Sequence, residues 1–254
     1  MMLRTHVFFV LMLCLANAGA AQSKSGESPH WTPGYQAAIH VGGQVPAQSL
    51  ADRFGASNTV GFSAYKIEAN GWRWGCHYRF QTGSEVREPG LLGNLLDPNG
   101  RMVDNEGRIA LVTPQQRGTL LTLSTGRLVQ TSAFQAGSGL LLEMNFGFWE
   151  HKVHFQNRGN RVTQLEDPYL AGYDRLTRGW LIIPRIGYYH DAPNGLVRFQ
   201  VGIESFLGRM QPQRTWNADT LTTDSGPRND GTVGLFAAWI LRLKARSTNV
   251  DYYH

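Results

Sequence analysis

The fold of this chain is decided by the stretch Trp72-Arg73-Trp74-Gly75-Cys76-His77-Tyr78-Arg79-Phe80, in which bulky or apolar side chains alternate with polar or small ones. Successive side chains of a β-strand point to opposite faces, so a strand here has one apolar face and one charged face. A helix would spread the same residues around its circumference. The stretch therefore predicts a β-strand, and similar alternation recurs through the C-terminal two-thirds of the chain.

Eight such segments are predicted, each close to the roughly 9–11 residues that a tilted transmembrane strand requires. They cover residues 35–43, 58–68, 72–82, 118–129, 138–149, 179–190, 196–207 and 232–244. Short turns at 69–71, 129–137 and 191–195, two of them containing Asn-Gly, alternate with a medium connection at 44–57 and long ones at 83–117, 150–178 and 208–231. This asymmetry is typical of outer-membrane proteins. The prediction is an all-β fold: an eight-stranded antiparallel transmembrane β-barrel with long extracellular loops and short periplasmic turns.

An export signal precedes the strands. Arg4 supplies a positive charge, residues 7–15 form an apolar core, and small residues at 16–21 offer a cleavage site. The apolar core is shorter than the roughly 20 residues of a spanning helix. We expect residues 1–21 to be a cleaved signal peptide and residues 22–254 to be the barrel. The expected location is the outer membrane of a Gram-negative cell.

A soluble up-and-down barrel such as a lipocalin is the alternative fold, and its apolar face would point inward. The apolar faces of this chain are too bulky for the interior of eight strands, which is only just wide enough for side chains to fill. They include Trp72, Trp74, Tyr78, Leu142, Met144, Phe146, Phe148, Phe199 and Trp239. The opposite faces carry small residues that suit a crowded lumen. They include Gly75, Ser124, Gly126, Gly147, Gly202 and Gly234.

The inward faces of the predicted strands carry a polar network. Its charged members are Arg73, His77, Arg79, Glu143, Arg185, Arg198, Glu204 and Arg242, with Asn145 and Gln200 beside them. Buried charge is costly unless it is paired, so Glu143 and Glu204 are the expected partners of the arginines. We interpret the network as structural, and a proton relay or a narrow site remains the alternative. Pro184 cannot donate to a sheet ladder, which predicts a bulge or a shifted register there.

Candidate chemical groups are few. Glu150, His151 and His154 follow the fifth predicted strand, and His190-Asp191 ends the sixth. His151 and His154 would point to opposite faces of a strand, which is unsuitable for a shared metal ion. His190 falls at a turn, where an interfacial or solvated role is expected. No serine stands beside a histidine in a recognisable catalytic motif, so we predict no catalytic, metal or cofactor site.

The loop at 83–117 contains two turn motifs, Asp97-Pro98-Asn99-Gly100 and Asp104-Asn105-Glu106-Gly107. The acidic spacing lacks the twelfth-position glutamate of a calcium loop, and Pro, Asn and Gly at these positions are typical of turns. We therefore predict a hairpin that projects above the membrane. The leucines before it, Leu91, Leu92, Leu95 and Leu96, are expected to fold over the barrel mouth or to contact a partner.

Composition narrows the function classes further. Charged residues make up 17% of the chain, below the roughly 25% of soluble domains. Cys76 alone remains after cleavage of the signal, so no internal disulfide forms. The net charge of +5 comes from dispersed arginines rather than from a clustered patch, which argues against nucleic-acid binding.

The stretch from Gln164 to Gly179, with Gly172-Tyr173-Asp174-Arg175-Leu176-Thr177-Arg178-Gly179 at its end, resembles a GYDRLTNG signature of small outer-membrane barrels of Bacteroidota. Arg178 stands where that signature has Asn. The resemblance continues through Ile186-Gly187-Tyr188, Gly202-Ile203-Glu204 and Trp239-Ile240-Leu241, and so covers most of the mature chain. It implies a barrel near the large outer-membrane machines for secretion or barrel assembly, without a known catalytic activity.

Within this signature, Tyr173, Asp174, Arg175 and Thr177 are candidate partner or loop-lock residues. Adjacent Asp174 and Arg175 cannot face the same way, so each needs a different partner. Tyr173 and Trp180 are expected to anchor the loop at the membrane interface, where aromatic rings are favoured. The alternative is a solvated loop without a preferred shape.

The leading functional prediction is a non-enzymatic barrel that serves as an accessory or scaffold subunit of a larger complex. The expected partners are outer-membrane lipid, including lipopolysaccharide, and other outer-membrane proteins. The alternatives are a lipid-modifying or protease-like barrel enzyme and a narrow channel, which the bulky charges of the lumen disfavour.

Overall fold

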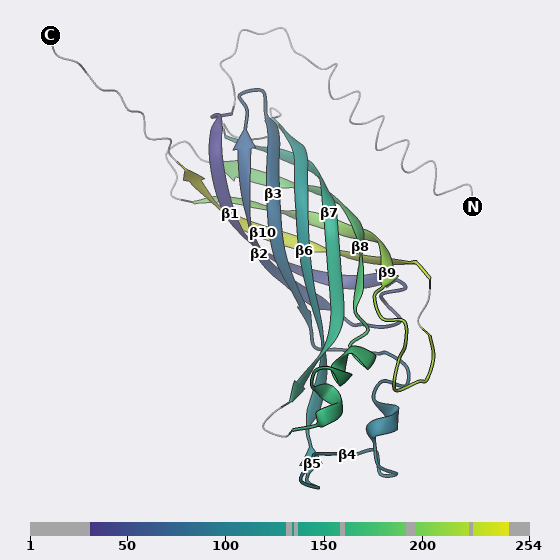
Figure 1. Ribbon diagram of the computed structural model, residues 1–254. Coiled ribbons are helices and arrows are strands. Elements are labelled where there is room, and N and C mark those ends of the chain that lie inside the picture. The colour runs from purple at the N-terminus through teal and green to yellow at the C-terminus, as the bar shows by residue number, and fades with distance from the viewer. Residues whose placement is uncertain are drawn as a thin grey trace, which may run out of the picture.

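The structure, a computed structural model, describes residues 31–130, 134, 137–157, 161–191, 197–223 and 226–243. Eight long strands dominate it (Figure 1). They are β1 (Gly34–Gln48), β2 (Ser57–Ile67), β3 (Trp72–Gly83), β6 (Val112–Val129), β7 (Ser138–Asn157), β8 (Thr177–Asp191), β9 (Arg198–Pro212) and β10 (Arg228–Leu243). No helix within the described ranges is long and apolar enough to cross a membrane. The predicted signal peptide and most of the turns at 131–136 and 192–196 lie outside the described residues.

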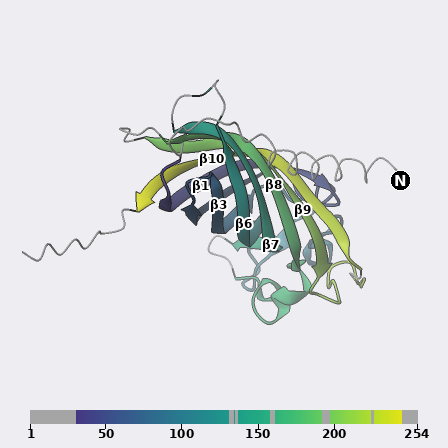
Figure 2. The ribbon, with the colours of Figure 1, turned by 90° about the horizontal axis from the view of Figure 1, so that it is seen from above.

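The strands form a closed antiparallel ring in the order β1-β10-β9-β8-β7-β6-β3-β2. The closing ladder pairs Ile39 of β1 with Trp239 of β10. Seen from above, the strands curve around a common interior (Figure 2). The predicted eight-stranded antiparallel barrel is therefore confirmed.

Several strands are longer than predicted, and most of the extra length lies at the loop end. β7 continues to Asn157 instead of ending near residue 149, and β6 begins at Val112 instead of residue 118. Backbone pairing does not require an apolar face, and the outward residues there are polar, including Arg117 and Lys152. The loops are accordingly shorter than the sequence suggested.

The outer wall of the barrel is apolar. Leu123, Phe146 and Trp239 are 69%, 48% and 59% exposed although they lie mid-strand. The inward partners on the same strands are buried and often charged, such as Arg73 on β3 and Glu143 on β7. An apolar outer wall around polar inward residues is the arrangement of a transmembrane barrel. A soluble barrel has the opposite arrangement, with its apolar face inside.

On β6, a charged outward residue marks each edge of this apolar band. These two residues are Arg117 and Arg127, and the outward side chains between them are Thr119, Leu121, Leu123 and Thr125. At about 3.3 Å per residue and a tilt of about 40°, this stretch rises about 25 Å along the barrel axis. The band therefore has the height of the apolar belt of a membrane barrel.

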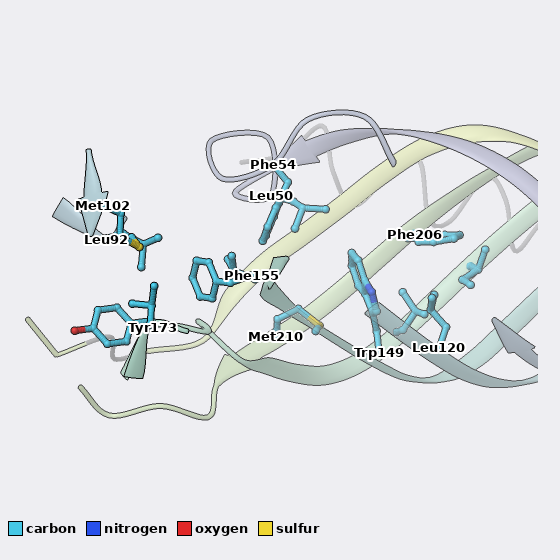
Figure 3. Packing of buried hydrophobic residues seen from close by; sticks show 14 of the residues in the cluster. Leu50, Phe54, Leu92, Met102, Leu120, Trp149, Phe155, Tyr173, Phe206 and Met210 are labelled. Carbon is cyan, nitrogen blue, oxygen red and sulfur yellow. The ribbon is translucent and has the colours of Figure 1, made fainter. Parts of the chain in front are cut away.

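The interior is layered, which the sequence analysis did not predict. A polar layer lies between two buried apolar clusters. The turn-side cluster includes Trp31, Leu128, Leu141 and Tyr189. The loop-side cluster begins inside the barrel at Leu120, Trp149 and Phe206 and continues out of the mouth (Figure 3). The lumen is thus plugged by apolar side chains as well as by the predicted polar ones.

Pro184 is accommodated without the predicted bulge. The β7–β8 register is constant through Met144 and Pro184, and the β8–β9 register is the same on both sides of the proline. Only the pairing of Ile183 and Pro184 with β9 is interrupted. Proline has no N–H to donate, and the β8–β9 ladder is interrupted at this point. Asn145 Nδ2 donates to the Ile183 carbonyl oxygen at 3.3 Å.

The loops gather into a cap below the barrel in Figure 1. It contains a short hairpin, β4 (Met102–Val103) with β5 (Ile109–Ala110), and three single-turn helices, η1 (Gly93–Leu95), η2 (Thr163–Leu165) and η3 (Tyr169–Gly172). The predicted turns at 97–100 and 104–107 are confirmed by backbone hydrogen bonds of 2.8 Å and 3.1 Å that close them. The predicted projecting hairpin is the β4–β5 unit.

Candidate functional site

The first candidate region is the polar layer of the lumen, where an alternating chain of charges crosses the barrel. Arg185 lies between two carboxylates, with Nη1 2.8 Å from Glu143 Oε1 and Nε 3.0 Å from Glu204 Oε2. Arg73 approaches Glu143 Oε2 at 3.4 Å, and Arg79 approaches Glu204 Oε2 at 2.8 Å. All five side chains are almost fully buried.

The strand registers explain how this chain of charges forms. Glu143 is the direct cross-strand neighbour of Arg185, and Arg185 is the neighbour of Glu204. The side chains of Arg73 and Arg79 reach these glutamates from β3. Gly126 stands between Arg73 and Glu143 in the sheet, and a Cβ there would lie 3.1 Å from the Glu143 Cβ. The missing side chain leaves room for the pair.

Neutral polar groups complete the layer. Gln44 Nε2 donates to Glu204 Oε1 at 2.8 Å, and Arg73 Nη1 donates to Gln200 Oε1 at 2.7 Å. The Arg73 guanidinium also lies 3.4 Å from the centre of the Tyr65 ring. His77 Nε2 is 3.7 Å from Glu143 Oε1. These contacts hold the charges in fixed positions, which suits a structural plug.

Two of the predicted lumen residues lie elsewhere. Arg198 and Arg242 do not reach Glu143 or Glu204 and instead pair with Asp191 at the turn end of the barrel. Tyr189 OH also donates to Asp191 Oδ2, at 3.4 Å. The sequence pattern predicts Asp191 at the boundary between the sixth strand and the following turn, and in the structure it is the last residue of β8 and faces inward. Asp191 lies two residues after the inward Tyr189, and alternation directs both side chains to the same face. Extending the strand by one residue would have identified Asp191 as a lumen residue.

The candidate catalytic residues are separated by the barrel wall. Glu150 and His154 face outward, and His151 is buried inside, as the predicted alternation requires. His151 Nε2 lies 2.8 Å from Asp230 Oδ2, and Ser49 Oγ donates to Asp230 Oδ1 at 2.5 Å. A catalytic serine must be bonded to the imidazole rather than to the carboxylate, so this set lacks the geometry of a serine hydrolase.

His190, the remaining candidate, has structural contacts. His190 Nδ1 lies 2.8 Å from Ser138 Oγ, and its ring stacks on Tyr188. Among the residues that the structure describes, no group of three or more His, Cys, Asp or Glu side chains is arranged to hold a metal ion.

The second candidate region is the cap, which has its own apolar core. Leu92, Met102 and Tyr173 are buried together there and are continuous with Phe155 and Met210 at the strand ends (Figure 3). Leu91 and Leu95 pack against this cluster, whereas Leu96 remains 42% exposed. The prediction that the leucines fold over the barrel mouth is confirmed for Leu91, Leu92 and Leu95.

The loop-lock residues have separate partners, as adjacent Asp174 and Arg175 require. Asp174 accepts two hydrogen bonds from Arg214, from Nε at 2.9 Å and Nη2 at 2.7 Å. Hydrogen bonding with Asp174 raises the pKa of Arg214 above its ordinary value. Arg175 has a left-handed backbone, with φ of 50°, and donates from Nη2 to Asp219 Oδ1 at 2.6 Å. These two ion pairs tie the 161–176 loop to the 213–223 loop.

The remaining signature residues also belong to the cap. Thr177 Oγ1 donates to the Arg175 carbonyl oxygen at 3.0 Å. Tyr173 is 5% exposed, with its hydroxyl 3.2 Å from Asn94 Nδ2, so the expectation that it anchors the loop at the membrane interface is wrong. It is drawn inward because the leucines of the 83–117 loop form an apolar core around it. Trp180, by contrast, is 66% exposed on the outer wall.

No family model and no curated protein matches the chain. Several solved structures of β-barrel proteins are similar. Neisserial surface protein A (NspA) is 11% identical, with 82% of this chain and 97% of that chain covered and a TM-score of 0.48. Ail, the attachment invasion locus protein of Yersinia pestis, solved with the heparin analogue sucrose octasulfate, is 8% identical, with 83% and 100% covered and a TM-score of 0.41.

A third similar structure is the N-terminal β-barrel domain of Pseudomonas aeruginosa OprF. It is 10% identical, with 83% of this chain and 100% of that chain covered and a TM-score of 0.37. At these identities and TM-scores the similarities carry no argument about function. The fold described above rests on the strand registers of this chain.

Proposed function

We propose that this chain is a non-enzymatic barrel of the outer membrane whose cap docks other outer-membrane proteins. The observation that carries the proposal is the contrast between a plugged barrel and an ordered cap with apolar side chains on its surface. At the β4–β5 hairpin, Val103, Ile109 and Leu111 are 45%, 55% and 74% exposed. We call these three residues the tip patch.

The tip patch is well suited to a protein partner. Val103 and Ile109 are direct cross-strand neighbours, and Leu111 follows β5, so the apolar surface is continuous. Further exposed apolar residues on the cap are Leu96, Tyr169, Trp216 and Leu221. Exposed apolar patches on folded proteins commonly mark interaction sites. A role as accessory or scaffold subunit in a secretion or barrel-assembly complex fits these features.

The alternatives receive less support. A channel requires an open lumen, and this one is crossed by the Glu143–Arg185–Glu204 chain and by apolar clusters on both sides of it. An enzyme requires reacting groups that meet at one place, and Glu150, His151 and His154 are divided by the wall.

The orientation is tested by labelling intact cells with a membrane-impermeant thiol reagent. The parent chain carries Cys76→Ala, because Cys76 is exposed on the outer wall. Asn99→Cys in the cap should be labelled on intact cells, and Asn70→Cys in a turn should be labelled only after lysis. The reverse pattern contradicts the proposed topology.

The docking role is tested by pull-down of the tagged protein from its own outer membrane in mild detergent, followed by mass spectrometry. Leu111→Glu should remove specific outer-membrane partners without unfolding the barrel, because Leu111 is already 74% exposed. Asn99→Glu, an exposed polar change on the same loop, is the control and should leave the partners unchanged. If Leu111→Glu and the parent chain retain identical partners, the tip patch is not the docking site.

A further inference from the structure

The outer wall carries a band of positive charge at the loop end of the barrel. Arg117 on β6, Lys152 on β7, Arg178 on β8 and Arg209 on β9 all face outward. The strands of a closed eight-stranded barrel are tilted and staggered, so residues at one height are offset along neighbouring ladders. With that stagger the four residues lie at nearly the same level, and we call them the basic rim.

One end of the basic rim, on β6 and β7, holds like charges side by side. Arg117 and Lys152 are direct neighbours in the β6–β7 ladder, where opposite side chains lie about 5 Å apart. Like charges in this position are destabilising. The Arg117 guanidinium donates to Gln115 Oε1 at 2.9 Å and lies 5.4 Å from the centre of the Phe80 ring. Neither Arg117 nor Lys152 has a carboxylate partner within the described part of the chain.

The other end of the rim, on β8 and β9, does not neutralise this charge. Arg178 pairs with Glu150, and Arg209 Nη1 donates to the neutral Asn229 Oδ1 at 3.2 Å. Glu150 is therefore the single carboxylate paired with the four cations in the described structure. A diffuse counter-ion would screen such a patch in water, but a patch that borders lipid needs an anion held at the same depth.

The outer wall next to the rim, on the side away from the cap, is apolar. Phe148 and Trp180 are direct neighbours, with ring centroids 4.0 Å apart, and Leu121 adjoins Phe148 on β6. This pair lies two residues from the Glu150–Arg178 pair in the same ladder, on the side away from the cap. A ligand at this position would meet cations at its head and aromatic and aliphatic surface along its tail.

We propose that the basic rim binds the phosphate groups of lipid A, the membrane anchor of lipopolysaccharide, with its acyl chains against Phe148 and Trp180. This inference rests on the proposed outer-membrane location with the cap outside, because that orientation places the rim in the leaflet that contains lipopolysaccharide. Arginine and lysine form strong charge-assisted hydrogen bonds with phosphate. Strands about 4.8 Å apart spread the four cations over roughly 15 Å, wide enough for a phosphorylated disaccharide headgroup.

The test measures lipid binding to the purified full chain in detergent by native mass spectrometry. The probes are lipid A, chemically dephosphorylated lipid A, and inorganic phosphate. Arg117→Gln with Lys152→Gln removes the two adjacent cations at the β6–β7 end of the rim. The matched control is Arg127→Gln with Lys66→Gln, which removes two outward cations at the turn end. Heat-modifiable migration establishes that each variant is a folded barrel.

The wild-type chain should bind lipid A, and the rim variant should bind it about tenfold more weakly or worse, since each charge-assisted hydrogen bond contributes about 1.5–3 kcal/mol. The control should stay within about twofold of wild type, because the two charges that it neutralises lie away from the site and their loss removes no such bond. Dephosphorylated lipid A should bind weakly to all chains. Inorganic phosphate should not compete at equal concentration.

Several outcomes overturn the inference. Equal lipid A binding by the folded rim variant and wild type removes the site, and equal binding of dephosphorylated lipid A removes the role of phosphate. Effective competition by inorganic phosphate makes the rim a simple anion site rather than a lipid site. If wild type is absent from the outer-membrane fraction of cells, the proposed function fails as well. If it is present there and shows no preference for lipid A, the inference alone fails.

Discussion

The barrel and the cap both contain buried arginine–carboxylate pairs, but the two regions hold them differently. In the barrel, Glu143, Arg185 and Glu204 are fixed by neighbouring positions in continuous ladders. In the cap, Asp174 meets Arg214 and Arg175 meets Asp219 across two separate loops without a shared ladder. A pair in the lumen is therefore coupled to the closure of the whole ring, whereas a pair in the cap is coupled only to the arrangement of the loops. Substitutions in the two regions should separate these effects.

Glu143→Gln should destabilise the entire barrel. The substitution leaves the buried charges of Arg73 and Arg185 without one carboxylate, and breaking a buried pair in this way costs about 3–5 kcal/mol. Urea unfolding of the refolded protein in detergent, followed by heat-modifiable migration, measures the loss. Adding Arg185→Met should recover part of it, because the uncompensated charge is then removed. A change below about 0.5 kcal/mol for Glu143→Gln would show that the lumen chain is dispensable.

Phe146→Arg should also act on the barrel as a whole, through its outer wall. Phe146 is 48% exposed in the middle of the apolar band, where an arginine costs about 2–4 kcal/mol. The folded fraction in outer-membrane preparations should fall. His154→Arg on the same outward face of β7, beyond the band, is the control and should fold normally. A neutral Phe146→Arg would mean that this wall does not face lipid.

Asp174→Ala should loosen the cap and leave the barrel intact. It removes both hydrogen bonds from Arg214, and we expect a local loss of about 1–3 kcal/mol. Added protease should then cleave the 161–176 loop while the barrel remains heat-modifiable. Glu166→Ala, which breaks the exposed pair with Arg161 in the same loop, should change cleavage little. Wild-type resistance of a double Asp174→Ala and Arg175→Ala variant would refute the loop lock.

The smallest effect concerns a single turn of the cap and depends on pH. The backbone N–H of Arg108 donates to Asp104, and this bond, with the Arg108 side chain and the Glu106 N–H, holds the pKa of Asp104 below its usual value near 3.8. A depressed carboxylate pKa stabilises the fold above the ordinary Asp range, and the contribution is lost as pH falls through the lowered value.

Hydrogen exchange of the 104–108 turn should therefore be slow from neutral pH down to about pH 4, after correction for the intrinsic rate, and should lose protection only below it. The barrel amides should stay protected over the same range. Asp104→Asn should remove the pH dependence of the turn. Simultaneous loss of protection in turn and barrel would contradict their separation.

The sequence allowed much of the barrel and little of the cap to be predicted. Alternation located the strands and their outward faces, and it identified Glu143, Arg185 and Glu204 as lumen residues. It could not reveal the apolar layers of the interior, because Leu181 and Ile183 lie on a stretch of β8 that is apolar on both faces. It also gave no signal that Pro184 would keep the register.

The partners of the loop lock could not be found from the sequence for a physical reason. Arg214 and Asp219 lie about 40 residues from Asp174 and Arg175, in a loop without periodicity. Local pattern indicates that two adjacent charged residues need different partners, but only the folded strand ends determine which loops meet.

The continuity of the apolar column from the lumen into the cap has a consequence for the order of folding. The column combines side chains from the β1–β2 connection, from β7 and from β9, such as Phe54, Phe155 and Met210. These segments are far apart along the chain, so bringing them together carries a loop-closure cost. We therefore expect the cap to acquire its full core only once the ring has closed. A conformational antibody against the folded cap would then act as a reporter of completed ring closure, and its delay relative to membrane insertion would time the last step of assembly.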